Sequence, residues 1–437
     1  MTASSPGIAR QTAFLAAFVV FTGFLLNFVT RGVVDTFMIF IVPLEHEFGW
    51  SRTVLTATYS IYLVTVGVMS PISGAMLHKF GPRAMYGAGV AILGLSMWGM
   101  SHISSLWQVY ALNGIFCGIA SSALGMVPAA ALIAKWHDRH LSLAISLAYA
   151  GLGSGVLVIV PLAQIVIDAD GWRAAYTAMT IALGLLLPAI LVLPWSRISK
   201  GRLVTDDASP ATAPPPKTAP PVAGTAPVKS LSGILWAARS REFWLLVQVF
   251  FFTAFSVYCV VVQVVAYLVE SGYPAIDAAL IFGVTGMLSI FGVVFAGWLS
   301  DRYGYRFTAT LSFVGTFIGI AALFTFSTVP APWLIVVYAV AFGMSQGARG
   351  PVVSTLTTRI FAKGSVGVIF GTVFMTMSFG SALGAWLSGL LHDLTGGYEA
   401  AFLVSGVGVL IAAAPFWLSD RLKNPRALDM PVAAHSP

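Results

Sequence analysis

The chain has 437 residues, of which 58% are hydrophobic and only 9% are charged, and its mean hydropathy is +0.88. A water-soluble core of this size cannot hide so much apolar surface, so a soluble globular protein is excluded. The formal net charge of +7 is compatible with a nucleic-acid partner or with a membrane topology, and the positions of the basic residues decide between the two.

Apolar runs of about 20 residues recur along the whole chain and match the ~30 Å hydrocarbon thickness of a bilayer. They predict an all-α polytopic membrane protein with twelve transmembrane helices. In chain order the expected spans are roughly 13–43, 53–77, 84–102, 106–134, 141–167, 173–195, 242–269, 276–299, 307–327, 332–359, 365–391 and 399–419.

Most of the basic residues fall in the even-numbered connections and at the two termini, whereas the opposite face carries only Arg52 and Arg173. This asymmetry follows the positive-inside rule and predicts a multi-pass protein of the plasma (inner) membrane with both termini in the cytoplasm. It explains the excess of positive charge, so no nucleic-acid partner is expected. Cys117 and Cys259 lie in apolar runs and are interpreted as small hydrophobic residues. The first span lacks a cleavage pattern and is expected to be retained.

A stretch rich in proline, alanine and threonine, SRISKGRLVTDDASPATAPPPKTAPPVAGTAPVKSLSG, separates spans six and seven. Its composition predicts a disordered or partly polyproline linker. We therefore expect an N-terminal six-helix bundle at 1–195, a cytoplasmic linker at 196–241, a C-terminal six-helix bundle at 242–420 and a cytoplasmic tail at 421–437.

The two halves are copies of one another. Residues 48–83 align without gaps on 271–306, so that Gly49 falls on Gly272 and Gly81 on Gly304. Parallel six-span repeats predict two pseudo-symmetric bundles that flank a central path, with a binding site near the bilayer midplane.

Two matching loops, "GAMLHKFGPR" and "GWLSDRYGYR", resemble the loop signature of the major facilitator superfamily. The stretches "PLEHEFGWSR", "KWHDRHLSLAISLAYAGLGSG" and "YLVESGY" are similar to the bacterial monocarboxylate-porter and oxalate–formate-antiporter branch of that superfamily. The resemblance implies alternating access, in which the two bundles rock about a central site.

The same resemblance implies that an acidic loop residue fixes the inner ends of neighbouring helices. Asp301 occupies that position in the second copy, whereas the first copy has His78 there. We therefore expect Asp301 to act in a cytoplasmic gate with Arg302, Arg306 and Arg83. The alternative interpretation is that Asp301 is a solvated loop charge.

Three ionisable residues remain inside the spans: Arg31, Asp35 and Arg349. A charge at the centre of a membrane helix costs roughly 2.5–3.5 kcal/mol on insertion scales, so pairing, water or a ligand must compensate. Asn27 precedes Arg31 by four residues, as Arg31 precedes Asp35, so these three side chains share one helix face.

Two interpretations of these charges are open. In the first, Arg31 and Asp35 form a structural ion pair and nearby carbonyl groups satisfy Arg349. In the second, Arg349 is the principal anion ligand, Arg31 is the next, and Asp35 carries the coupling proton, since arginine suits forked binding of a carboxylate. Further contacts in the second interpretation are expected from the polar span residues Asn27, Gln346, Tyr149 and Tyr258.

The resembled branch carries a substrate-binding arginine in span eight, and "DAALIFGVTGMLSIFGVVFAGWLS" has none. The substrate therefore cannot be transferred from the family. Two buried arginines against one aspartate favour import of a small organic anion, a monocarboxylate first, by proton symport. An anion antiporter and a proton-driven exporter of a hydrophobic compound remain the alternatives. The chain has no nucleophile–base set, phosphate-binding loop or clustered metal-ligand pattern, so we expect neither an enzyme nor a cofactor or metal.

Overall fold

The structure, a computed structural model, describes residues 6–133, 135–136, 141–198, 238–360 and 366–419. All regular secondary structure in these ranges is helical. The predicted tail at 421–437 and nearly all of the predicted linker at 196–241 lie outside the described residues.

The helices fall into two compact units. The first unit holds residues 1–36 and 68–225. Its helices are α1 (Pro6–Asp35), the later part of α3 (Arg52–Met100), α4 (Leu106–Val109), a π-helical stretch (Tyr110–Phe116), α5 (Cys117–Leu124), α6 (Met126–Ile133), α7 (Leu141–Asp170), α8 (Trp172–Val192) and α9 (Trp195–Ile198).

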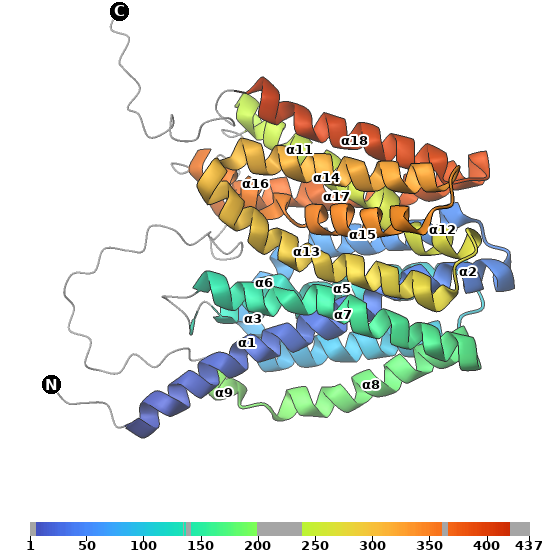
Figure 1. Cartoon of the computed structure of the whole chain (residues 1–437). Coiled ribbons are helices and arrows are strands. Elements are labelled where there is room, and N and C mark those ends of the chain that lie inside the picture. Colours follow the sequence, from blue (N-terminus) through green and yellow to red (C-terminus); the bar gives the residue numbers. More distant parts are fainter. Residues whose placement is uncertain (1–5, 134, 137–140, 199–237, 361–365, 420–437) are drawn as a thin grey trace, which may run out of the picture. The chain divides into compact units, whose positions relative to one another are not determined.

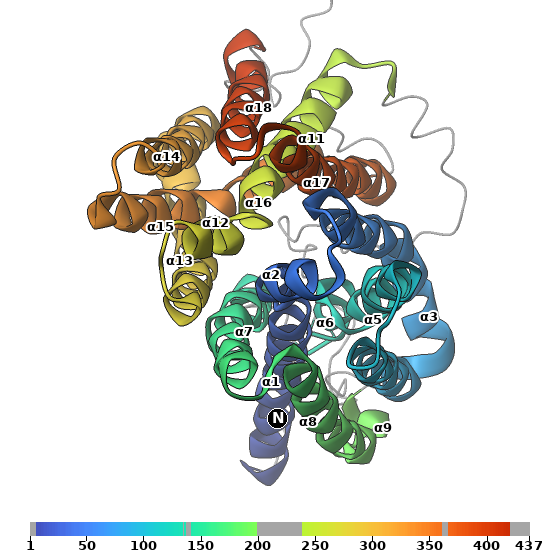
Figure 2. The same ribbon diagram turned by 90° about the vertical axis from the view of Figure 1, so that its right-hand side faces the viewer.

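The second unit holds residues 37–67 and 226–437, so it includes a short segment from the first half of the sequence. Its helices are α2 (Phe37–Phe48), the beginning of α3, α11 (Arg241–Val261), α12 (Val264–Glu270), α13 (Ala275–Tyr303), α14 (Tyr305–Phe326), α15 (Pro332–Gln346), α16 (Arg349–Ile360), α17 (Val366–Thr395) and α18 (Glu399–Leu418). Within this unit α14 lies beside α15, as Figure 2 shows.

Ten helical segments of the described chain are long and apolar enough to cross a bilayer, and Pro332–Gln346 is a shorter apolar helix. Large apolar side chains remain exposed on them; on α8, for example, Leu185 is 72% exposed and Val192 is 83% exposed. Such a surface is stable against lipid rather than water. The prediction of an all-α, multi-pass membrane protein is therefore confirmed.

Helix α1 packs closely along α7 in the first unit, as Figure 1 shows. Gly151 and Gly155, one helical turn apart on α7, permit this approach. A Cβ atom built on Gly151 would lie 2.2 Å from the carbonyl oxygen of Phe24, and one built on Gly155 would lie 2.0 Å from that of Phe28. Small residues four apart are the usual means of close helix contact in membranes.

The second unit repeats this device where α17 packs against α11. Cβ atoms built on Gly380 and Gly384 would each lie 2.2 Å from a carbonyl oxygen of α11, those of Phe251 and Phe255. The repeat seen in the sequence thus reappears as the same glycine pair at the same kind of helix contact.

The two loop-signature glycines form tight turns in equivalent places. Gly81 has φ 76° and lies at a kink inside α3, where the predicted second and third spans meet. Gly304 has φ 86° and joins α13 to α14. Glycine suits both positions because a side chain there would be strained.

Four expected spans are interrupted rather than continuous. The breaks fall at Thr36 between α1 and α2, at Gly125 between α5 and α6, at 262–263 between α11 and α12, and at 347–348 between α15 and α16. Apolar length could not locate them because it describes a whole span and does not register a local break in the backbone. Broken membrane helices are tolerated where the freed backbone is buried in protein or lines a cavity.

The first prediction concerns the α1–α7 contact. Gly155→Ala should lower the free energy of unfolding by about 1–3 kcal/mol, because the new methyl group must push away the backbone of α1. Thermal unfolding of the purified protein measures this effect. Gly184→Ala on α8 is the matched control, since a Cβ atom at Gly184 meets nothing within 4 Å. Equal unfolding temperatures for the two variants would contradict the close-contact interpretation.

Candidate functional site

Two of the helix breaks, at Gly125 and at 347–348, fall at equivalent places in the two sequence copies. Gly125 ends α5 with an extended ψ of −155°, and α6 begins at Met126. In the second copy α15 ends at Gln346, and α16 begins at Arg349. Interrupted helices at corresponding positions of two repeats are a physical indicator of a transporter binding site.

Arg349 is the first residue of α16 and is only 2% exposed. Its Nη2 donates a hydrogen bond of 3.0 Å to Oγ1 of Thr316, and its guanidinium carbon lies 4.9 Å from the centre of the Phe313 ring. The Thr316 hydroxyl in turn donates to the carbonyl oxygen of Ser312 at 3.0 Å. The guanidinium plane is therefore held from one side by α14.

The remaining donors of Arg349 are unsatisfied. Within the described part of the chain, Nε and Nη1 of Arg349 are buried and have no hydrogen-bond partner. A buried charged donor without an acceptor is costly, so such a group calls for an explanation. Nε and Nη1 lie on different edges of the guanidinium group, and each shares its edge with one N–H of Nη2. A carboxylate can make a forked contact with the edge whose Nη2 hydrogen is not directed to Thr316. The arrangement can therefore accept a small carboxylate.

The polar neighbours of Arg349 on α15 are used for helix packing. Ser345 accepts through its carbonyl oxygen from the Ser312 hydroxyl at 2.9 Å, which joins α15 to α14. Gln346 donates from Nε2 to the carbonyl oxygen of Thr285 at 3.2 Å, which joins α15 to α13. The structure therefore places Gln346, a predicted ligand residue, in a helix–helix hydrogen bond.

The first unit contains the predicted pair of opposite charges. Nε of Arg31 lies 2.7 Å from Oδ2 of Asp35, and the side chains are 28% and 3% exposed, respectively. Asp35 is the last residue of α1, directly before the break at Thr36. The ion pair of the first interpretation is thus present. Among the described residues, Arg349, in contrast, donates to a threonine hydroxyl, where this interpretation assumed carbonyl groups.

Asn27 is fully buried one turn before Arg31. Its Nδ2 donates to the carbonyl oxygens of Gly23 at 2.9 Å and Ala148 at 3.3 Å, while its Oδ1 has no partner among the described residues. Tyr149 follows Ala148 on α7 and is half-buried. Asn27, Arg31, Asp35 and Tyr149 thus lie on two packed helices of the first unit.

Tyr258 and the predicted gate residues lie elsewhere. The Tyr258 ring lies 6.0 Å from the ring of Tyr59 in the second unit. Arg302 is exposed, and its guanidinium carbon lies 5.7 Å from the centre of the Trp298 ring. Arg306 lies 3.8 Å above the ring of Trp417.

Arg83 is exposed in the first unit and lines a shallow cavity of about 530 Å³ with α8. The side chains of Asp301 and His78 lie outside what the structure describes. Among the described side chains, no group of three or more His, Cys, Asp or Glu could hold a metal ion.

Sequence reasoning gave too little weight to Gln263. This residue lies at the break between α11 and α12, is 0% exposed, and neither its Nε2 nor its Oε1 has a hydrogen-bond partner in the described chain. An amide in the apolar run "CVVVQVVAY" is the signal that could have identified it. A second missed group surrounds Arg52, which sequence reasoning treated only as a topological charge.

These features define a class: a multi-span membrane protein with internal repeats, matching helix breaks and a buried cation at one of them. Residues 20–348 and 291–431 match the Major Facilitator Superfamily. The chain belongs to this superfamily. It is a transporter rather than an enzyme.

Named relatives cover nearly the whole chain. Monocarboxylate transporter 13 of Rattus norvegicus is 28% identical over 423 residues, which cover 95% of this chain and 93% of the relative. Monocarboxylate transporter 11 of Homo sapiens is 27% identical, with coverage of 89% and 79%. The uncharacterized MFS-type transporter YcxA of Bacillus subtilis (strain 168) is 22% identical, with coverage of 89% and 92%. The predicted resemblance to the monocarboxylate-porter branch agrees with these relatives.

The second prediction concerns the stability cost of Arg349. Arg349→Met should leave the free energy of unfolding unchanged or raise it by about 1–4 kcal/mol, because a buried cation with only a neutral hydroxyl as acceptor in the described chain gives way to an apolar side chain of similar length. Thermal unfolding without ligand measures the change. Arg302→Met, at an exposed position, should have little effect and serves as the control. A strongly destabilised Arg349→Met variant would show that the guanidinium group has a structural partner.

Proposed function

We propose that this protein is a secondary active transporter that carries a small organic anion, a monocarboxylate first, together with a proton. The observation that carries the proposal is Arg349, a buried guanidinium group at a helix break whose Nε and Nη1 have no partner in the described chain. A carboxylate would supply the negative charge that this group lacks and acceptor oxygens for one edge of the guanidinium group. The names of the relatives support the same ligand class.

The proposed architecture has twelve spans in two six-helix bundles, at 1–195 and 242–420, joined by a cytoplasmic linker at 196–241. The protein is assigned to the plasma (inner) membrane, with both termini and the tail at 421–437 in the cytoplasm. Ten candidate spans and the basic even-numbered connections support this arrangement. Alternating access about a central site follows from the repeated halves.

Asp35 is proposed as the proton-coupling group and Arg31 as its regulator. Asp35 is buried, and its 2.7 Å contact with Arg31 compensates its charge. If a bound anion draws Arg31 away, the carboxylate is left desolvated and takes up a proton. Ligand and proton then bind together, which is the requirement of a symporter.

Asn27, Tyr149, Tyr258 and Gln346 are proposed as further ligand contacts. The free Oδ1 of Asn27 favours its inclusion, and Gln346 must first leave its hydrogen bond to Thr285. Asp301 with Arg302, Arg306 and Arg83 is proposed as the cytoplasmic gate, on the grounds of the loop signature.

The third prediction tests the anion site. Arg349→Lys keeps the positive charge but loses the forked donor pair, so it should weaken monocarboxylate binding by about tenfold or more, equivalent to ~1.4 kcal/mol. Uptake of a radiolabelled monocarboxylate into proteoliposomes gives the concentration dependence. Arg302→Lys is the matched control and should behave like the wild type. Wild-type affinity in a folded Arg349→Lys variant would remove Arg349 from the site.

The fourth prediction tests proton coupling. Asp35→Asn imitates the protonated carboxyl group permanently, so the variant should still exchange anion for anion but lose accumulation driven by a pH gradient. Counterflow and gradient-driven uptake in the same proteoliposomes separate the two activities. Uphill uptake with the wild-type pH dependence would show that the proton travels elsewhere, and an antiporter or exporter would then explain the data better.

A further inference from the structure

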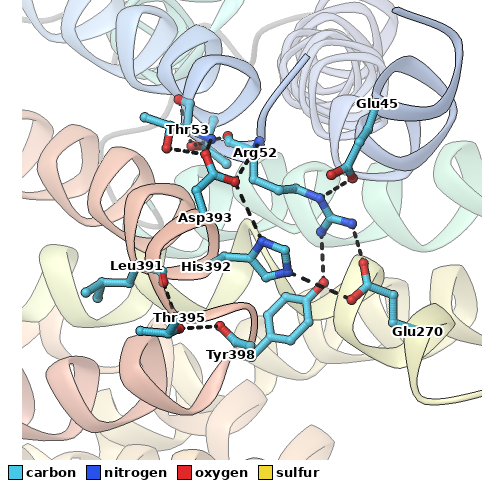
Figure 3. Close-up of polar contacts among 11 residues, drawn as sticks. Glu45, Arg52, Thr53, Glu270, Leu391, His392, Asp393, Thr395 and Tyr398 are labelled. Carbon is cyan, nitrogen blue, oxygen red and sulfur yellow. Dashed lines mark hydrogen bonds and ion pairs between the residues drawn. The ribbon is translucent and has the colours of Figure 1, made fainter. Parts of the chain in front are cut away.

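A second buried arginine lies in the second unit, and each nitrogen of its guanidinium group has a protein acceptor. Arg52, the first residue of α3, is 2% exposed. Its Nε is bonded to Glu45 of α2, its Nη2 to Glu270 at the end of α12, and its Nη1 donates to the hydroxyl of Tyr398 at 2.8 Å (Figure 3). Glu270 and Tyr398 are 218 and 346 residues away in the sequence.

The backbone beside Arg52 is held as well. Asp393, in the last turn of α17, accepts a hydrogen bond of 3.1 Å from the backbone N–H of Arg52 and one of 2.8 Å from that of Thr53. The Thr53 hydroxyl also donates to this carboxylate. A carboxylate at a helix N-terminus satisfies free N–H groups and the helix dipole. Asp393 therefore caps α3 from another helix.

The residues that the second half of the sequence contributes to this cluster are held by aromatic contacts and hydrogen bonds. The Tyr398 ring lies 5.1 Å from that of Tyr267 and 4.7 Å from that of His392, and Tyr267 also donates to the carbonyl oxygen of Leu323 at 2.9 Å. Burial raises the pKa of the Tyr398 phenol above its usual range, so the hydroxyl stays neutral and accepts from Arg52. Nε2 of His392 lies 3.9 Å from Glu270, within ion-pair reach when protonated.

Below the cluster, the beginning of α3 packs directly on α17. A Cβ atom on Gly389 would lie 2.2 Å from Oγ1 of Thr56 and 2.7 Å from the carbonyl oxygen of Arg52. One turn further on, the Ser60 hydroxyl donates to the carbonyl oxygen of Ala382 at 2.7 Å. The polar cluster thus lies at one end of the contact between α3 and α17, and this contact leaves no room for a side chain at position 389.

We propose that Glu45, Arg52, Glu270, Asp393 and Tyr398 form a latch, here named the Arg52 latch, that holds segment 37–67 against α12, α17 and α18 and must separate whenever the anion site opens toward that side of the membrane. The proposal rests on the proposed transport function, which requires the two sequence halves to part at each face in turn. All five residues lie at or beside odd-numbered connections, the face with few basic residues.

Two features suit the cluster to reversible opening. The side chains of Glu45 and Glu270 are 32% and 42% exposed, so water can solvate these carboxylates as soon as Arg52 leaves. The repeat also places Ala275 at the position equivalent to Arg52. The arginine is therefore not needed to build the repeated unit, and its contacts join the two halves.

The fifth prediction is a distance measurement on the full-length protein in nanodiscs without any ligand. Spin labels are attached at His46→Cys on α2 and Val329→Cys between α14 and α15, two exposed positions outside the latch, after Cys117 and Cys259 are replaced by alanine. Double electron–electron resonance should give a dominant short distance. Arg52→Gln should raise the ratio of long to short distances by about tenfold, because it removes one partner of a buried ion network.

Two further variants act through different atoms. Gly389→Val should raise the long-distance population by wedging α3 from α17 while leaving every charge in place. Tyr398→Phe, which keeps the ring and removes only the hydroxyl group, should give a smaller rise in the same direction. Arg173→Gln is the matched control, since Arg173 is an exposed arginine of the same predicted face but lies on α8 in the first unit; it should leave the distances unchanged.

Size-exclusion chromatography identifies the variants that fold. If Arg52→Gln folds and its distances are unchanged, the latch proposal is overturned. If Arg52→Gln does not fold, unchanged distances in folded Gly389→Val overturn it. Since no anion is present, this outcome is independent of the transport proposal. If the distances lengthen in the variants but the wild-type protein binds no carboxylate, the proposed function is refuted and the latch proposal is retained.

Discussion

A guanidinium group buried inside a membrane protein must find acceptors, because neither lipid nor apolar side chains can replace the hydration it has lost. Arg349 meets this constraint only in part: Thr316 accepts from one nitrogen and Phe313 lies against the plane, while Nε and Nη1 remain without partners in the described chain. The break between α15 and α16 places this cation at the start of a helix. Burial, charge and missing acceptors together point to an anionic ligand, and the proposed function depends on this interaction.

Arg52 shows how the same side chain behaves once the constraint is met. Like Arg349 it is 2% exposed, but two carboxylates and a phenol accept from its three nitrogens. Because each nitrogen of this arginine already has a protein acceptor, its contacts join segments of the chain. In the proposed cycle the two arginines therefore have different roles. Arg349 binds the anion, and the Arg52 latch controls access to the anion site from one side of the membrane.

Much of the fold follows from the sequence because its causes are local. Apolar length predicted the membrane helices, the four-residue spacing predicted the Arg31–Asp35 contact, and the repeat predicted equivalent turns at Gly81 and Gly304. The helix breaks were missed because apolar length describes a whole span and does not register a local break in the backbone. Three partners of Arg52, namely Glu270, Asp393 and Tyr398, were missed because they lie hundreds of residues away, and only tertiary packing brings them together. Gln263 is visible in the sequence as an amide in an apolar run, but only the structure shows that this amide is buried and has no hydrogen-bond partner among the described residues.

The most direct test of the account compares acids with their amides. Purified wild-type protein and Arg349→Met are unfolded thermally in the presence of short monocarboxylates and of neutral amides with the same carbon skeletons. A carboxylate at about 100 times its dissociation constant should stabilise the wild type by about 2.7 kcal/mol, whereas the matching amide should have no effect, and Arg349→Met should lose the difference. Equal stabilisation of both proteins by the acid, or of the wild type by acid and amide alike, would contradict an anion site at Arg349.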